Sequence, residues 1–331
     1  MEEHLLLEIK NLEILYLTDE GAVHAVNGLN LKLGKGETLG LIGETGAGKT
    51  TVALGILRLV PNPPGKITGG QIWLDGKEIT AASEKEMRSI RGRKVSMIFQ
   101  DPMTSLNPVI PVIDQVAEVI LLHEKITTAE AMQKAEDALA KVGINRDRVK
   151  EYPHQFSGGM RQRVVIAMAL ACNPMLLIAD EPTTALDVTV QAQVLQLMRS
   201  LKTVYDTAMI LITHDLGIVA DICDKVAIMY AGNIVEYAEK RELFKNPKHP
   251  YTIGLFNSLP DINSDTDDLK PIKGLMPDPR ALPKGCPFHP RCEEAKPECA
   301  AAIPPNSNVE TANGGGHFVR CHLFTAAEVQ Q

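Results

Sequence analysis

The chain has 331 residues, with 34 Lys and Arg against 41 Asp and Glu, so its net charge at neutral pH is −7. A mildly acidic protein of this kind has no general attraction to nucleic acid or to an anionic lipid surface. Hydrophobic residues make up 44% and charged residues 23%, a globular composition that excludes wholesale disorder. The length predicts one large domain with an appendage.

No segment has the character of a membrane span or a secretory signal. The longest apolar run, Val164–Cys172, falls short of the roughly 18–20 residues that a membrane helix needs. The N-terminus reads Met-Glu-Glu-His before only three leucines, which is not a secretory signal. We therefore expect a cytosolic protein, which could still bind a membrane partner. In that compartment six cysteines favour free thiols or metal ligands over disulfides.

The first part of the chain alternates short apolar runs with helical patterns. In chain order, the sequence predicts a strand at 38–42, a helix at about 49–59, a hairpin edge at 71–74 before Asp75-Gly76, a strand at 95–99, helical structure from about 113 to 142, and strands at 175–179, 209–212 and 226–229. Continuous apolar runs separated by helices are typical of strands buried on both faces of a parallel sheet.

Proline usage predicts the domain boundary. Residues 1–245 contain 9 prolines, whereas the last 86 residues contain 12 and show almost no hydrophobic periodicity. We place the boundary near Lys245–Asn246. The sequence thus predicts a domain at 1–245 and an irregular extension at 246–331.

A complete phosphate-binding motif follows the first apolar strand. The segment Gly43-Glu44-Thr45-Gly46-Ala47-Gly48-Lys49-Thr50 fits G-x-x-x-x-G-K-[ST], and a helix is predicted directly after it. The glycines let backbone N–H groups surround phosphate oxygens at the positive end of that helix. Lys49 is expected to reach the β- and γ-phosphates, and the Thr50 hydroxyl to ligate Mg²⁺. The alternative is a glycine-rich turn that binds nothing.

A second acidic element follows the strand at 175–179. Asp180 lies at the carboxyl end of this strand, where open α/β sheets bind their ligands, and is expected to hold Mg²⁺ through water. Glu181 is expected to polarise the water that attacks the γ-phosphate. In isolation, the same residues could form only a solvated acidic turn.

A third element, Phe156-Ser157-Gly158-Gly159-Met160-Arg161-Gln162, precedes a helical stretch that ends at Cys172. Ser157 is a good helix N-cap, and the two glycines allow a ligand to approach the backbone. Together with the phosphate loop and the Asp180-Glu181 strand, this element resembles the signature of the nucleotide-binding subunit of ATP-binding cassette (ABC) transporters. The resemblance covers residues from about 5 to 240. It departs from the commonest signature, Leu-Ser-Gly-Gly-Gln, at Phe156 and Met160.

The resemblance implies a fold and further site residues. The implied fold is a P-loop NTPase cassette with a RecA-like parallel sheet, an antiparallel β subdomain and an α-helical signature subdomain at about 101–173. Gln100 resembles the Q-loop glutamine that senses Mg²⁺ and water, His214 the switch histidine at the γ-phosphate, Asp187 of Ala185-Leu186-Asp187 the D-loop, and Tyr16 the residue that stacks on adenine. Without the family resemblance, each of these would more often be structural.

In this family two cassettes face each other head to tail, so the resemblance implies that each ATP is held between two chains. The implied ATP-binding residues are Tyr16, Gly43, Glu44, Thr45, Gly46, Ala47, Gly48, Lys49, Thr50 and Thr51; the Mg²⁺ residues are Thr50, Gln100 and Asp180; the catalytic residues are Gln100, Glu181 and His214; and Ser157, Gly158, Gly159, Met160 and Gln162 act on the ATP of the partner.

Two further stretches resemble one subfamily, the dipeptide, oligopeptide and nickel importers. They are Gln100–Pro108 and His249-Pro250-Tyr251-Thr252, with Leu255 and Leu259-Pro260 after the second. The resemblance implies a second, different ATPase chain, two transmembrane permeases and an extracytoplasmic substrate-binding protein, with this chain on the cytoplasmic face of the membrane. The alternatives are a non-transport cassette in a soluble assembly and an exporter ATPase.

Four of the six cysteines, Cys286, Cys292, Cys299 and Cys321, lie in the proline-rich extension. Their spacings of 5, 6 and 21 intervening residues are wider than the usual pairs of a structural zinc site, and four thiolates are the usual ligands of an iron–sulfur cluster. The resemblance to dipeptide-importer ATPases also implies a [4Fe-4S] cluster here. Zinc and unmetallated thiols remain open. His289, His317 and His322 are nearby and could replace a ligand, but we expect them at the surface.

Overall fold

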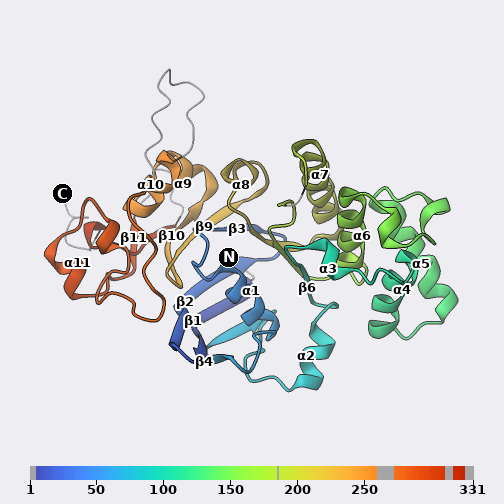
Figure 1. The fold of residues 1–331 in the computed structure, drawn as a ribbon, viewed down its shortest axis with the longest axis horizontal. Helices are drawn as coiled ribbons and strands as arrows, with labels where there is room; N and C mark the ends of the chain where they lie inside the picture. The colour runs from blue at the N-terminus through green and yellow to red at the C-terminus, as the bar shows by residue number, and fades with distance from the viewer. Residues whose placement is uncertain (1–4, 185, 259–271, 310–315, 325–331) are drawn as a thin grey trace. The chain divides into compact units, whose positions relative to one another are not determined.

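The computed structural model describes residues 5–184, 186–258, 272–309 and 316–324 (Figure 1). The chain forms two compact units, and neither is continuous in sequence. The first unit comprises residues 1–8, 32–38 and 73–218, and the second comprises 9–31, 39–72 and 219–331. Met1–His4, Ala185 and Leu259-Pro260, which entered the sequence predictions, lie outside the described residues.

The first unit contains three parallel strands, β6 (Val95–Ile98), β7 (Leu176–Asp180) and β8 (Ala208–Ile212), in that order. Every residue of β7 and β8 is buried. The continuous apolar runs at these positions therefore predicted the strands correctly, because a strand covered on both faces needs no polar alternation.

Helices make up most of the remaining first unit, and Figure 1 shows α4, α5 and α6 grouped together. Its helices are α2 (Glu84–Ile90), α3 (Pro102–Ser105), α4 (Val112–His123), α5 (Thr128–Lys141), η1 (Arg146–Arg148), η2 (Pro153–Gln155), α6 (Gly158–Leu170) and α7 (Val188–Tyr205). The helical pattern from 113 to 142 forms two helices, because the Thr127 side chain and Glu130 form a capping box that starts α5.

The second unit contains the strand order β11-β12-β10-β9-β3, with β3 parallel to β9 and the other neighbours antiparallel. These strands are β3 (Thr38–Ile42), β9 (Lys225–Tyr230), β10 (Asn233–Glu239), β11 (Ser307–Val309) and β12 (His317–Val319). All five residues of β3 are buried, and the phosphate-binding motif leads from this strand into α1 (Lys49–Leu57).

A second group of strands lies in the order β2-β1-β4-β5. Its members are β1 (Leu5–Thr18), β2 (Gly21–Gly34), β4 (Gly65–Leu74) and β5 (Lys77–Glu78). The end of β4 pairs with β5 in antiparallel fashion across Asp75 and Gly76, which confirms the predicted hairpin. Both turn residues have a positive φ, as such a turn requires. No helix among the described residues is long and apolar enough to cross a membrane.

The C-terminal residues consist of short elements. They are α8 (Leu216–Ile222), which begins in the first unit, then α9 (Lys240–Lys245), α10 (Pro250–Asn257), η3 (His289–Arg291), α11 (Pro297–Ala301) and η4 (His322–Phe324). Strand β12 of the predicted extension pairs with β10, which lies before the predicted boundary at 245.

A buried carboxylate organises this part of the second unit. Glu236 is fully buried and accepts hydrogen bonds from the backbone N–H groups of Lys248 (2.7 Å) and His249 (3.0 Å), and its Oε1 lies 2.7 Å from Nε2 of His317. The expectation of surface histidines was wrong for His317, which is fully buried, and for His322, which is 9% exposed. Strand β12 buries His317 when it pairs with β10 beside Glu236.

We expect Glu236→Ala to destabilise the second unit by about 3–5 kcal/mol, because two backbone donors and a buried histidine lose their acceptor. For a unit of this size the melting temperature should fall by roughly 6–20 °C, measured by thermal unfolding. Glu293→Ala is the control, because the Glu293 side chain is 76% exposed. Equal melting temperatures for both variants would contradict the role of Glu236.

Candidate functional site

The phosphate loop lies between β3 and α1 in the second unit, as predicted. Gly48 precedes the helix with a φ of 100°, which favours glycine, and a Cβ there would lie 2.3 Å from the carbonyl oxygen of Ala25. A Cβ on Gly43 would lie 2.2 Å from the carbonyl oxygen of Met229. Both glycines are therefore required by close approach of the neighbouring backbone.

The Lys49 ammonium is buried inside this loop. Its Nζ donates to the carbonyl oxygens of Gly43 (2.8 Å) and Glu44 (3.1 Å), and the residue is only 8% exposed. Thr45, Gly46 and Thr50 are exposed, and Thr51 is partly buried. The loop thus presents a fixed cation and open backbone at the start of a helix, an arrangement suited to an anionic phosphate.

Three predicted catalytic side chains meet in the first unit. Gln100 Nε2 donates to Glu181 Oε2 at 3.0 Å, and His214 Nδ1 lies 3.5 Å from Glu181 Oε1. The Thr184 hydroxyl also donates to Oε2 at 3.0 Å. The Glu181 carboxylate is 19% exposed, whereas the His214 side chain is 68% exposed.

The backbone at Glu181 is strained. Its φ is +46°, in the left-handed region that non-glycine residues rarely adopt, and its N–H donates to the Ile212 carbonyl at 2.8 Å. Such strain persists only where surrounding bonds hold it, and it concentrates at functional sites. The turn directs the carboxylate toward Gln100 and Thr184 at the end of β7.

The remaining nucleotide-binding predictions are distributed over both units. Asp180 is 4% exposed at the end of β7 in the first unit, whereas Thr50 belongs to the second. Their shared Mg²⁺ therefore stays a prediction. Tyr16 is partly buried in β1, and its adenine contact stays a prediction as well.

The signature segment starts α6. Ser157 is the N-cap of this helix, and its hydroxyl accepts from the N–H of Met160 at 3.4 Å. Ser157 and Gly158 are exposed, so their polar groups are available to a ligand, whereas Gln162 is 1% exposed and lies within the unit. Asp187 is exposed and caps α7 through the N–H of Val190 at 3.0 Å.

The four cysteines of the extension share one small cavity in the second unit, which is also lined by His249, Pro250, Phe288, His289, Glu294, His322 and Leu323. All six cysteines lie in described parts of the chain, and none of them forms a disulfide. Burial, together with smaller contributions from the other three cysteines of the cavity, raises the pKa of Cys321 to about 11. Cys286 and Cys299 are 8% and 7% exposed. The topology therefore gathers cysteines that are up to 35 residues apart in the sequence.

Within the described ranges, no three His, Cys, Asp or Glu side chains form a group that could hold a single metal ion. The four cysteines thus share a cavity without the close convergence of a one-ion site. His249 lines the cavity and is 1% exposed, and its Nε2 has no hydrogen-bond partner among the residues that the structure describes. Its Nδ1 accepts from the N–H of Tyr251 at 3.0 Å. In the neutral ring Nε2 therefore carries the proton.

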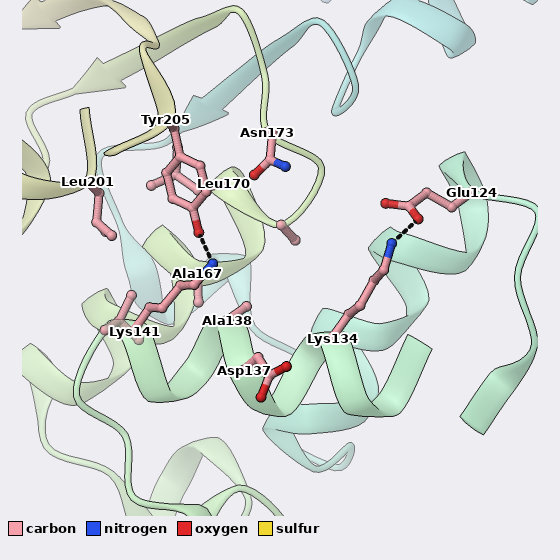
Figure 2. Close-up of a pocket in the computed structure, with 12 residues that line it drawn as sticks. Glu124, Lys134, Asp137, Ala138, Lys141, Ala167, Leu170, Asn173, Leu201 and Tyr205 are labelled. Atoms are coloured by element: carbon pink, nitrogen blue, oxygen red, sulfur yellow. Dashed lines mark hydrogen bonds and ion pairs between the residues drawn. The ribbon is translucent and has the colours of Figure 1, made fainter. Parts of the chain in front are cut away.

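A pocket of about 210 Å³ lies in the helical part of the first unit (Figure 2). Figure 2 shows Lys134 paired with Glu124 and Lys141 bonded to the Tyr205 hydroxyl, the latter at 2.8 Å. None of the predicted site residues lines this pocket. Its two lysines already have partners, so we assign it no part in the predicted chemistry.

Sequence reasoning missed several residues that hold the site. Thr184 contacts the Glu181 carboxylate, and Arg291 binds the Glu44 carboxylate through two hydrogen bonds of 2.6 and 3.0 Å. Tyr251 was noted only for its resemblance, but its hydroxyl accepts from the Glu44 N–H at 2.9 Å. Arg291 and Glu44 are 247 residues apart, so no local pattern could have revealed the pair.

Comparison with known proteins agrees with these motifs. The profile of the ABC transporter family matches residues 26–184, and that of the oligopeptide/dipeptide transporter C-terminal region matches residues 235–299. The oligopeptide transport ATP-binding protein AppD of Bacillus subtilis is 47% identical over 328 residues, which are 98% of this chain and 99% of AppD. The chain belongs to the ABC transporter family, among its ATP-binding subunits. The oligopeptide transport ATP-binding protein OppD of Salmonella typhimurium is 50% identical, over 91% of this chain and 90% of OppD.

Solved structures support the cassette fold. A dimeric post-hydrolysis state of the ATP-binding cassette MJ0796, bound to ADP and Pi, has a TM-score of 0.64 and 26% identity, and covers 71% of this chain and 99% of that cassette. The cassette cbiO1 of Clostridium perfringens, part of the transporter complex cbiONQ, has a TM-score of 0.64 and 27% identity, over 76% of this chain and 96% of cbiO1. The predicted P-loop NTPase cassette fold is confirmed.

Proposed function

We propose that this chain is an ATP-hydrolysing subunit of an ABC importer for dipeptides or oligopeptides. The similarity to peptide transport ATP-binding proteins carries this proposal, because it extends over 98% of the chain and includes the region characteristic of their C-termini. The dipeptide transport ATP-binding protein DppD of Bacillus subtilis is also 46% identical, over 96% of this chain. Both substrate classes therefore remain candidates.

Each group of site residues has a distinct task in this proposal. The backbone and ammonium of the phosphate loop bind the phosphates of ATP, and Tyr16 stacks on the adenine. When bound, Mg²⁺ neutralises charge on the phosphates, with Thr50, Gln100 and Asp180 around it. Glu181 orients and deprotonates the attacking water. Gln100 and His214 keep the carboxylate of Glu181 in place, and His214 also contacts the γ-phosphate.

Two cassettes are required for hydrolysis in this proposal. Exposed Ser157 and Gly158 reach the ATP of a partner cassette, and the dimeric state of the similar cassette MJ0796 supports such an arrangement. Because Gln162 is buried, it acts by supporting α6 rather than by touching nucleotide. Closure of the pair around ATP and its release after hydrolysis would move two permease subunits.

The partners follow from the importer assignment. We propose a second ATPase chain, two transmembrane permeases and an extracytoplasmic substrate-binding protein, with this chain attached peripherally to the cytoplasmic face of the membrane and no role for nucleic acid. A tagged protein should be purified from detergent-solubilised membranes without oxygen. Two multi-span permeases and a second ATPase in the preparation would support the importer. Soluble partners alone would favour the alternative, a cassette in a metabolic or assembly complex.

We also propose that the cysteine cavity holds a [4Fe-4S] cluster. Its residues fit this group, because Cys286, Cys292, Cys299 and Cys321 line one cavity, and four thiols are the ligand set of such clusters. A bound cluster would cross-link the segment that holds Cys286, Cys292 and Cys299 to the segment that holds Cys321. Zinc and unmetallated thiols are the competing assignments.

A further inference from the structure

Glu44, the second residue of the phosphate loop, is held through three of its groups. Its backbone N–H donates to the Tyr251 hydroxyl at 2.9 Å, and its carbonyl accepts from Lys49 Nζ at 3.1 Å. Its carboxylate receives two hydrogen bonds from the Arg291 guanidinium, at 2.6 and 3.0 Å. Two of these three partners come from the last third of the chain, so the loop is anchored from outside its own strand and helix.

The anchoring residues are themselves rigidly placed. The Arg291 side chain is 6% exposed, its Nε donates to the Lys273 carbonyl at 3.0 Å, and its guanidinium lies 5.8 Å from the centre of the Tyr230 ring. The Tyr251 ring packs at 4.7 Å from that of Tyr230 and at 5.4 Å from that of Phe288, between centroids. A side chain fixed by packing loses little further freedom when it holds the loop.

Both anchors originate beside the cysteine cavity. Arg291 is adjacent in sequence to Cys292, and Tyr251 follows His249 by two residues; Cys292 and His249 both line the cavity. The Phe288 ring, three residues before Arg291, lines the cavity and also packs against Tyr230 at 5.2 Å. The packing that forms the cavity therefore also places the two groups that bind Glu44.

We propose that Arg291 and Tyr251 are positioning residues of the phosphate loop and act through Glu44. Through these two residues the C-terminal cysteine region sets the affinity of the loop for nucleotide. This inference rests on the proposed binding of ATP to the loop. Arg291 has two effects: it fixes the Glu44 peptide, whose carbonyl helps to place Lys49, and it neutralises a carboxylate beside the site of a polyphosphate. Removal of the Arg291 guanidinium alone leaves the Glu44 carboxylate unpaired beside the phosphates. Removal of both the guanidinium and the carboxylate leaves no unpaired charge there.

The charges of Glu44 and Arg291 can be removed one at a time and together in the full chain. Affinity for a slowly hydrolysed ATP analogue with Mg²⁺ is measured by fluorescence titration. We expect Arg291→Gln to weaken binding about tenfold, and Glu44→Gln to weaken it less than about threefold. The variant with both substitutions should bind within about threefold of Glu44→Gln, because adding Glu44→Gln restores most of the affinity that Arg291→Gln alone removes. Lys273→Gln is the matched control, because Lys273 pairs with Glu293 in the same region and its side chain is 83% exposed.

A second measurement tests the loop directly. Tyr251→Phe removes one hydroxyl and keeps the ring, so the fold should persist while the Glu44 N–H loses its acceptor. Hydrogen exchange of the nucleotide-free chain should then accelerate at least about threefold in the peptide that contains Glu44, and not in β7. This readout does not depend on the charge of Arg291, so it holds even if Arg291→Gln fails to fold.

The outcomes separate this inference from the proposed function. A wild-type chain that binds no ATP analogue would overturn the proposed function and the inference with it. Wild-type binding that Arg291→Gln leaves within about twofold would overturn the inference alone. Additive losses in the double variant would also overturn it, because Arg291 would then act independently of Glu44. Restoration in the double variant, with accelerated exchange in Tyr251→Phe, would support it.

Discussion

Glu181→Gln is expected to lower the rate of ATP hydrolysis by about a thousandfold while leaving ATP affinity within a few-fold of the wild type. Glutamine keeps the shape of the side chain and one oxygen that can accept from Gln100 or Thr184. It lacks the negative charge and the basicity that deprotonate water. The substitution should therefore weaken stabilisation of the transition state for hydrolysis and leave the binding of ATP unchanged.

The experiment needs phosphate release and nucleotide affinity measured on the same preparation. Glu118→Gln, an exposed position on α4, is the matched control and should retain the wild-type rate. Because ATP would bind to the Glu181→Gln protein without being hydrolysed, its closed pair with the second ATPase chain should also accumulate, visible by size-exclusion chromatography with MgATP. Hydrolysis at a normal rate would show that another group is the base.

The sequence predicted the parts of the fold that depend on local patterns. The strands β3, β7 and β8 are continuous apolar runs because both of their faces are covered, and the phosphate loop is a contiguous motif whose glycines are required by nearby backbone. Glu181 was predicted from the acidic turn after its strand. Gln100 and His214 were predicted from family resemblance, because the three residues follow different strands and meet only when those strands pair.

Contacts between distant segments could not be predicted in the same way. Glu236 lies in a strand where a charged residue suggests solvent, and only the pairing of β10 with β12 buries it against His317. Arg291 likewise stands among short, proline-punctuated elements with no periodic signal. Its contact with Glu44 depends on the path of the chain through the second unit. Both pairs connect the predicted extension to residues before position 245.

Substitution of a cysteine in the cavity is expected to have a large effect on the metal content of the protein. Wild-type protein purified without oxygen should carry about four iron atoms and a similar amount of acid-labile sulfide per chain. Cys299→Ser should carry almost none, because Cys299 lines the cavity and a cluster of four irons needs four ligands. Loss of the cross-link should also lower the melting temperature of the second unit, since metal binding contributes to folding.

The chain contains its own controls, because two of its six cysteines do not line this cavity. Cys172 and Cys223 lie in other surroundings and form no disulfide, so Cys172→Ser and Cys223→Ser should keep the full iron content. Equal iron in the Cys299→Ser and Cys172→Ser proteins would contradict the ligand assignment. One zinc per wild-type chain would replace the cluster with a structural ion. A metal-free wild type with an unchanged melting temperature in Cys299→Ser would leave these thiols as small buried apolar groups.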